Sequence, residues 1–140
     1  MQKQFILFFI LFSVFLPNCE KENVKPGDSD CEGIFCTDIF VSVNILIKHS
    51  NDNSPVILTK YKVIRTSDNE DITIKDNDLT DNNGYYVIVN DSSTGLITNK
   101  NTEVEFQGYI NDSLVVQKLF IVKKDCCHVS LVSGDPVVYI

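Results

Sequence analysis

The sequence contains none of the short motifs that identify the common catalytic classes. It has no G-x-S-x-G nucleophile elbow, no H-E-x-x-H zinc motif and no glycine-rich phosphate loop. Only two histidines are present, His49 and His128. A hydrolase would therefore have to rely on paired carboxylates, and aspartates are common enough here to form pairs by chance. We expect a protein that is not an enzyme and that needs no cofactor.

The chain is also poor in basic residues. Twelve Lys and Arg residues stand against 19 Asp and Glu residues, which gives a formal net charge of −7. Nucleic-acid backbones and anionic lipid headgroups are bound through clusters of positive charge. The charge balance therefore excludes nucleic acid as a partner, and any attachment to a membrane must come from apolar groups.

No hydrophobic run is long enough to cross a bilayer. The longest, Phe5–Leu16, is apolar apart from Ser13. It is about half of the roughly 20 residues that a membrane-spanning helix needs. A short polar segment with Lys3 precedes the run, and Pro17 ends it because proline cannot continue a helix. The N-terminal segment is therefore predicted to be a signal peptide with a short helix.

The signal peptide ends in Leu16-Pro17-Asn18-Cys19. This resembles the lipobox of bacterial lipoproteins, in which an aliphatic residue stands three positions before the cysteine that is acylated. Leu16 and Cys19 match the pattern, whereas Pro17 and Asn18 occupy positions where small residues are usual. The resemblance implies a signal peptide over 1–18 and a membrane anchor through acyl chains on Cys19. The protein would then lie in the cell envelope, on the periplasmic or surface face of the outer membrane. The alternative is an ordinary signal peptide followed by an incidental cysteine.

Four cysteines remain once Cys19 is assigned to lipid. An even number in an oxidising compartment indicates two disulfides. A bond between the neighbours Cys126 and Cys127 would close a strained ring, so bonds from these two to Cys31 and Cys36 are favoured. The sequence leaves the pairing open. A zinc or copper site formed by the four thiolates and His128 is the alternative.

The segment 20–30, which follows Cys19, is charged and contains Pro26 and Gly27, and it predicts a flexible acidic tether over 19–35. The remainder, 36–140, is predicted to be one domain. It consists of short apolar runs separated by Asn, Asp, Gly and Ser, with no helical pattern. The predicted strands are 39–48, 56–66, 72–75, 84–90, 102–110, 114–122, 127–132 and 137–140. This arrangement predicts an all-β protein, an antiparallel sandwich of about seven or eight strands.

Several segments resemble the carboxypeptidase regulatory-like, or transthyretin-like, family. They are Val43–Lys48, Pro55-Val56, Tyr61–Ile64 and Leu79–Val89, where Thr80-Asp81-Asn82-Asn83-Gly84-Tyr85 is similar to a family motif that opens a strand. Ser54 stands where the family usually has glycine. The resemblance implies an Ig-like sandwich, which is an accessory domain without catalytic residues. Asp125–Gly134 also resembles the ends of small secreted bacterial lipoproteins.

Two groups of residues are candidate ligand sites. Asp76, Asp78 and Asp81 crowd oxygen ligands into a short segment, as calcium loops do, although Asp also dominates ordinary turns. Tyr85, Tyr86 and Tyr109 could present aromatic rings to a glycan or to another envelope protein. Because Tyr85 and Tyr86 are adjacent on a strand, one of them must point away from the core.

These observations predict a non-catalytic cell-envelope lipoprotein that acts as a binding or structural module. The alternative is a glycan- or calcium-dependent ligand-binding lipoprotein of an uptake or adhesion system.

Overall fold

The computed structural model describes residues 31–74 and 83–140, and almost all of the regular structure in them is β. The predicted signal helix and most of the predicted tether lie outside the described residues. The strands are β1 (Ser42–Lys48), β2 (Lys60–Arg65), β3 (Glu70–Asp71), β4 (Tyr85–Asn90), β5 (Thr102–Ile110), β6 (Ser113–Lys124), β7 (Val129–Ser133) and β8 (Val137–Tyr139). A 3-10 turn, η3 (Asp91–Ser93), follows β4.

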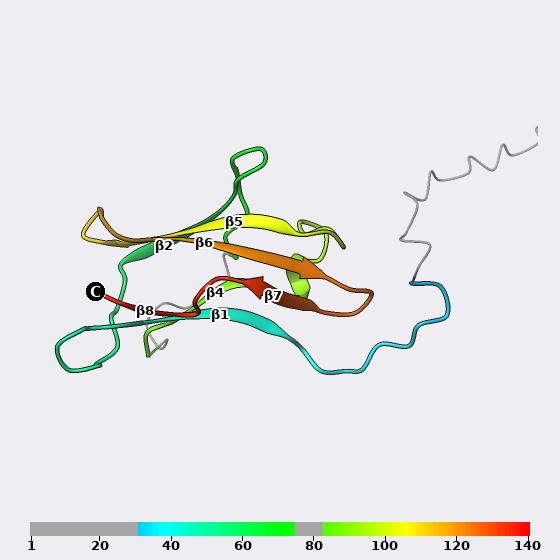
Figure 1. The fold of residues 1–140 in the computed structure, drawn as a ribbon, viewed down its shortest axis with the longest axis horizontal. Coiled ribbons are helices and arrows are strands. Elements are labelled where there is room, and N and C mark those ends of the chain that lie inside the picture. The colour runs from blue at the N-terminus through cyan, green and yellow to red at the C-terminus, as the bar shows by residue number, and fades with distance from the viewer. Residues whose placement is uncertain (1–30, 75–82) are drawn as a thin grey trace, which may run out of the picture.

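The strands form two sheets that face each other (Figure 1). One sheet has the order β4-β1-β8 and the other β3-β2-β5-β6-β7. Every pair is antiparallel except β1 with β8, which is parallel. The predicted all-β antiparallel sandwich of about eight strands is thus confirmed, and the pair β1 with β8 is the one parallel pair among the described strands.

The parallel pair arises because the chain changes sheets between β7 and β8. Gly134 lies in this connection with φ +120°, a conformation that side-chain-bearing residues rarely adopt. A Cβ at Gly134 would lie 2.4 Å from the Phe120 ring. The Ser133–Pro136 connection therefore does not fold β8 back onto β7. It carries the chain to the other sheet, where β8 joins the free side of β1.

The core follows the alternation that predicted the strands. Val43, Ile45 and Ile47 of β1 are buried, while the residues between them are partly exposed. Tyr86 of β4 lies 5.5 Å from Tyr61 of β2 and 6.1 Å from Phe106 of β5, measured between ring centroids. These contacts join the two sheets, because β4 belongs to one of them and β2 and β5 to the other.

The predicted strand 56–66 is shorter than expected, since β2 begins only at Lys60. Residues 56–59 connect the two sheets, and a side chain from the core binds their backbone. The Tyr86 hydroxyl donates to Val56 O at 2.9 Å and accepts from Leu58 N at 2.7 Å. The Tyr86 hydroxyl thus makes the hydrogen bonds that a neighbouring strand would otherwise make where the chain passes from one sheet to the other.

The strand predicted over 72–75 is wrong in its position, because β3 contains only Glu70 and Asp71, residues 72–74 are not in a strand, and Lys75 lies outside the described residues. Ile72 N still donates to Val63 O at 2.8 Å, but Val63 N donates to the Thr73 hydroxyl rather than to a backbone carbonyl. The backbone pairing of β2 with β3 therefore ends where the Thr73 hydroxyl accepts the hydrogen bond from Val63 N.

The Asn83-Gly84 turn before β4 has positive φ at both residues, +40° at Asn83 and +81° at Gly84. A Cβ at Gly84 would lie 2.7 Å from Ile47 O, so glycine also permits the close approach of this turn to β1.

Candidate functional site

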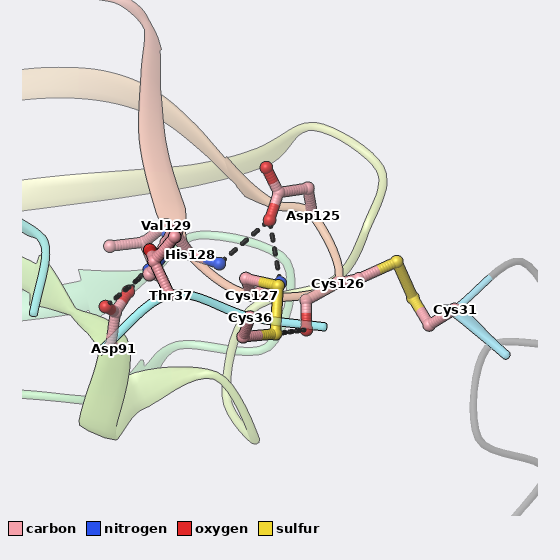
Figure 2. The surroundings of a disulfide bond; sticks show 9 residues. All are labelled: Cys31, Cys36, Thr37, Asp91, Asp125, Cys126, Cys127, His128 and Val129. Atoms are coloured by element: carbon pink, nitrogen blue, oxygen red, sulfur yellow. Dashed lines mark hydrogen bonds and ion pairs between the residues drawn. A yellow bond between two sulfur atoms is a disulfide. The ribbon is translucent and has the colours of Figure 1, made fainter. Parts of the chain in front are cut away.

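Two disulfides join the first described residues to the turn between β6 and β7 (Figure 2). Cys31 bonds to Cys126 and Cys36 bonds to Cys127, across 95 and 91 residues of sequence. The predicted bonds between the two cysteine groups are therefore present, and the structure supplies the pairing that the sequence left open. Because all four sulfurs are in disulfides, the alternative of a zinc or copper site formed by four thiolates does not apply to this state.

Adjacent cysteines can bond to different partners because they lie in a tight turn. Asp125 Oδ1 accepts hydrogen bonds from Cys127 N and His128 N, both at 2.8 Å, and Asp125 N donates to His128 O at 2.9 Å. The two backbone N–H groups lower the pKa of Asp125. Strand β7 therefore begins at Val129 and not at Cys127, where the sequence predicted its start. In Figure 2 Cys126 points toward Cys31 and Cys127 toward Cys36.

Residues 31–41, which we call the strap, run from the disulfides to the start of β1. Asp91, directly after β4, holds the last residue of the strap. Its Oδ2 accepts from Val41 N at 2.8 Å, and its Oδ1 accepts from Val129 N at 3.0 Å. Burial raises the pKa of Asp91, but the hydrogen bonds from Val41, His128 and Val129 outweigh it, so the pKa is lowered overall.

His128 connects Asp91 to the middle of the strap. Its Nδ1 lies 2.9 Å from Asp91 Oδ2, and its Nε2 lies 3.2 Å from the Thr37 hydroxyl oxygen. A carboxylate only accepts, so Nδ1 carries a proton and donates it to Asp91. The order carboxylate, imidazole, hydroxyl is also that of a nucleophile relay. No signal in the sequence indicates this group, because its three members are far apart along the chain.

An open pocket of about 320 Å³ lies beside this group. The strap residues Ile34, Phe35 and Thr37 form one wall, and the turn Asp125–His128 forms the other. Its walls are mainly apolar, and Phe35 is 96% exposed. The pocket is therefore the place where the strap presents apolar groups to its surroundings.

The three candidate tyrosines do not form one ligand face. Tyr86 is 2% exposed and belongs to the core, so its place in such a face is corrected. Tyr85 points outward from the three-stranded sheet. Tyr109 lies on the outer side of the other sheet, since its neighbour Gly108 faces Leu58 in the core. There Tyr109 donates to Gln107 Oε1 and lies under the Lys60 ammonium group.

The outer face of the three-stranded sheet instead pairs Tyr85 with Tyr139, which was not among the candidates from the sequence. Tyr85 lies opposite Leu46 on one side of β1, and Tyr139 lies opposite Lys48 on the other. Directly opposed residues share a face of the sheet. The two tyrosines are 54% and 55% exposed. The alternation of Tyr139 with the buried Val138 was the sequence signal that could have found it.

The calcium candidates Asp76, Asp78 and Asp81 lie outside the described residues. Within 31–74 and 83–140, no group of three or more His, Cys, Asp and Glu side chains is placed to hold a metal ion.

Comparison with family models, with curated proteins and with solved structures finds no significant match. None of the helical segments in the described part of the chain is both long enough and apolar enough to span a bilayer.

Proposed function

We propose that the chain is a non-catalytic, lipid-anchored module of the bacterial cell envelope that binds or supports another envelope component. The observation that carries this proposal is the pair of disulfides between the strap and the β6–β7 turn. Long-range disulfides of this kind form and persist in oxidising compartments. They account for four of the five cysteines and leave Cys19, at the end of the signal-like segment, for acylation.

The Asp91–His128–Thr37 group fits this proposal as a structural clamp. Asp91 accepts from backbone N–H groups of both the strap and β7, so its carboxylate holds two separate segments in place. Thr37 stands on the strap, so its contact with His128 ties the strap to the β6–β7 turn. The group therefore serves to fix the strap against the sandwich.

The N-terminus of the mature chain tests the proposal. We expect mass spectrometry of the protein from a bacterium that processes lipoproteins to show Cys19 as residue one, with acyl chains attached. The Cys19→Ser variant should lose the acyl mass. An unmodified Cys19, or a mature N-terminus at another residue, would contradict the anchor. Free thiols at the other four cysteines after export would contradict the oxidising location.

A second candidate function, glycan binding, is favoured by the outer face of the three-stranded sheet. Tyr85 and Tyr139 flank β1 there, with Lys48 and Asn44 on the same face. Exposed aromatic rings beside hydrogen-bonding groups are suited to stack on sugar rings. Binding of the wild-type chain to a printed glycan array would test this function, and the absence of any bound glycan would count against it.

A further inference from the structure

The strap presents an unusual concentration of exposed apolar side chains. Ile34, Phe35, Ile39 and Phe40 are 51%, 96%, 67% and 63% exposed, although the strap contains only the residues 31–41. Scattered apolar residues on a protein surface are ordinary, but a contiguous group marks a surface that another component covers.

These side chains sit on a segment that is already fixed in place. The two disulfides hold the strap at Cys31 and Cys36, and hydrogen bonds hold it at Thr37 and Val41. Binding through a fixed segment does not require that segment to lose further conformational freedom. The strap is therefore a preformed surface.

The position of the strap in the chain indicates what covers it. Cys19 precedes Cys31 by only 12 residues of sequence. Even a fully extended chain of that length reaches no more than roughly 40 Å. If Cys19 is acylated, Cys31 at the start of the strap is therefore tethered within roughly 40 Å of the bilayer, and the strap is the first part of the domain that the tether reaches. It lies at the end of the sandwich opposite the β5–β6 hairpin (Figure 1).

Charge favours apolar insertion over binding to headgroups. The chain carries a net charge of −7, and Glu32 and Asp38 lie within the strap itself. Electrostatic attraction to an anionic surface is therefore not expected at this end of the molecule. Phe and Ile side chains can instead enter the boundary between headgroups and acyl chains, where amphipathic segments bury about 5–10 Å of depth.

We propose that the strap docks on the phospholipid bilayer that holds the acyl chains of Cys19, with Phe35 as the deepest residue. This inference rests on the proposed lipid anchor and adds to it the orientation of the domain. The strap would face the bilayer, and the opposite end of the sandwich, which carries the β5–β6 hairpin, would face away from the bilayer.

The absence of tryptophan from the chain makes a direct test possible. Phe35→Trp introduces a single fluorescent reporter at the most exposed of the large apolar side chains of the strap. Leu114→Trp is the matched control, because Leu114 is also exposed, at 48%, but lies beside the β5–β6 hairpin. The acylated mature variants are placed in phosphatidylcholine vesicles that carry bromine on the acyl chains. Mass spectrometry first establishes the acyl chains and both disulfides.

We expect the indole of the Phe35→Trp variant to emit at shorter wavelength in vesicles than in buffer. Brominated lipid should quench it several-fold more strongly than it quenches the indole of the Leu114→Trp control. Equal quenching of the two acylated variants would overturn the docking while leaving the anchor intact. An emission of the Phe35→Trp variant that shifts with protein concentration, and that bromine does not quench, would show that a second copy covers the strap instead. A mature chain without acyl groups would overturn both the anchor and the docking.

Discussion

Asp91 links the end of the strap to the β6–β7 turn and to β7. One carboxylate links Val41 at the end of the strap, His128 in the β6–β7 turn and Val129 at the start of β7. Its side chain is only 14% exposed, so its hydrogen bonds are partly shielded from water. A carboxylate can accept all three hydrogen bonds at once, and no neutral side chain of the same shape can do so.

Asp91→Asn should therefore lower the free energy of unfolding at pH 7 by about 2 kcal/mol, because hydrogen bonds to charged groups contribute roughly 1.5–3 kcal/mol. The amide nitrogen of asparagine would face backbone N–H groups that need an acceptor. Urea unfolding measures the loss. Asp112→Asn, an exposed change of the same charge in the β5–β6 turn, should change the unfolding free energy little.

The same residue predicts a pH dependence. The pKa of Asp91 is lower in the folded chain than its ordinary value near 3.9. The stabilisation is therefore present above about pH 4 and is lost as the pH falls through the folded pKa. The stability difference between the wild type and Asp91→Asn should shrink in acid. A difference that stays constant from about pH 7 to about pH 3 would contradict this role of the carboxylate.

The strap and the β6–β7 turn are the elements that the disulfides connect. The two bonds close nearly the same long loop. In the chain-entropy description, the first bond to close a loop of that length contributes about 4.5 kcal/mol, and the second closes only a small additional ring worth about 2–3 kcal/mol. The contributions of the two bonds to stability should therefore not be additive.

Removal of either bond alone, by Cys31→Ser with Cys126→Ser or by Cys36→Ser with Cys127→Ser, should cost about 2–3 kcal/mol. Removal of both bonds should cost about 7 kcal/mol, which is more than the sum of the two single losses. Urea unfolding of the three variants and the wild type measures the difference. Single losses that add up to the combined loss would contradict the shared loop.

Strands were predictable where the alternation of side chains is local. The range Thr102–Ile110 matches β5 at both ends, because apolar and polar residues alternate without interruption. The strand boundary was predicted wrongly where a distant side chain makes the backbone hydrogen bonds in place of a neighbouring strand, as the Tyr86 hydroxyl does at Val56–Leu58. A boundary was also predicted wrongly at the start of β7, where the Asp125 carboxylate binds the backbone before Val129. Nothing in the local sequence shows that these partners will meet.

The candidate site was predictable only in part, for the same reason. Two disulfides between the cysteine groups followed from the count and the compartment, whereas their pairing depends on the turn geometry at Asp125. The clamp of Asp91, His128 and Thr37 depends on contacts between residues 37 and 91 positions apart. A single sequence carries no record of such contacts.

At the scale of the whole molecule, the strap is a separate surface from the outer face of the β4-β1-β8 sheet, which carries Tyr85 and Tyr139. The strap leaves one end of the sandwich, whereas the β4-β1-β8 sheet extends along its length toward the other end (Figure 1). Docking of the strap on a bilayer would therefore leave Tyr85 and Tyr139 open to solvent. Substitutions in the strap should then alter docking on the membrane without altering ligand binding, and substitutions of Tyr85 and Tyr139 should do the reverse.

Tyr85→Ala combined with Tyr139→Ala should weaken binding to a glycan identified on the array by about tenfold or more. Each aromatic contact is worth about 0.5–1.5 kcal/mol beyond the buried area, and about 1.4 kcal/mol corresponds to a factor of ten. Titration calorimetry with that glycan measures the loss. Tyr109→Ala, on the outer face of the other sheet, is the matched control and should bind as the wild type does. Acylated forms of both variants should stay on phosphatidylcholine vesicles, because Cys19 and the strap are unchanged. If the control lost affinity as much as the double variant, the binding face would not be the β4-β1-β8 sheet.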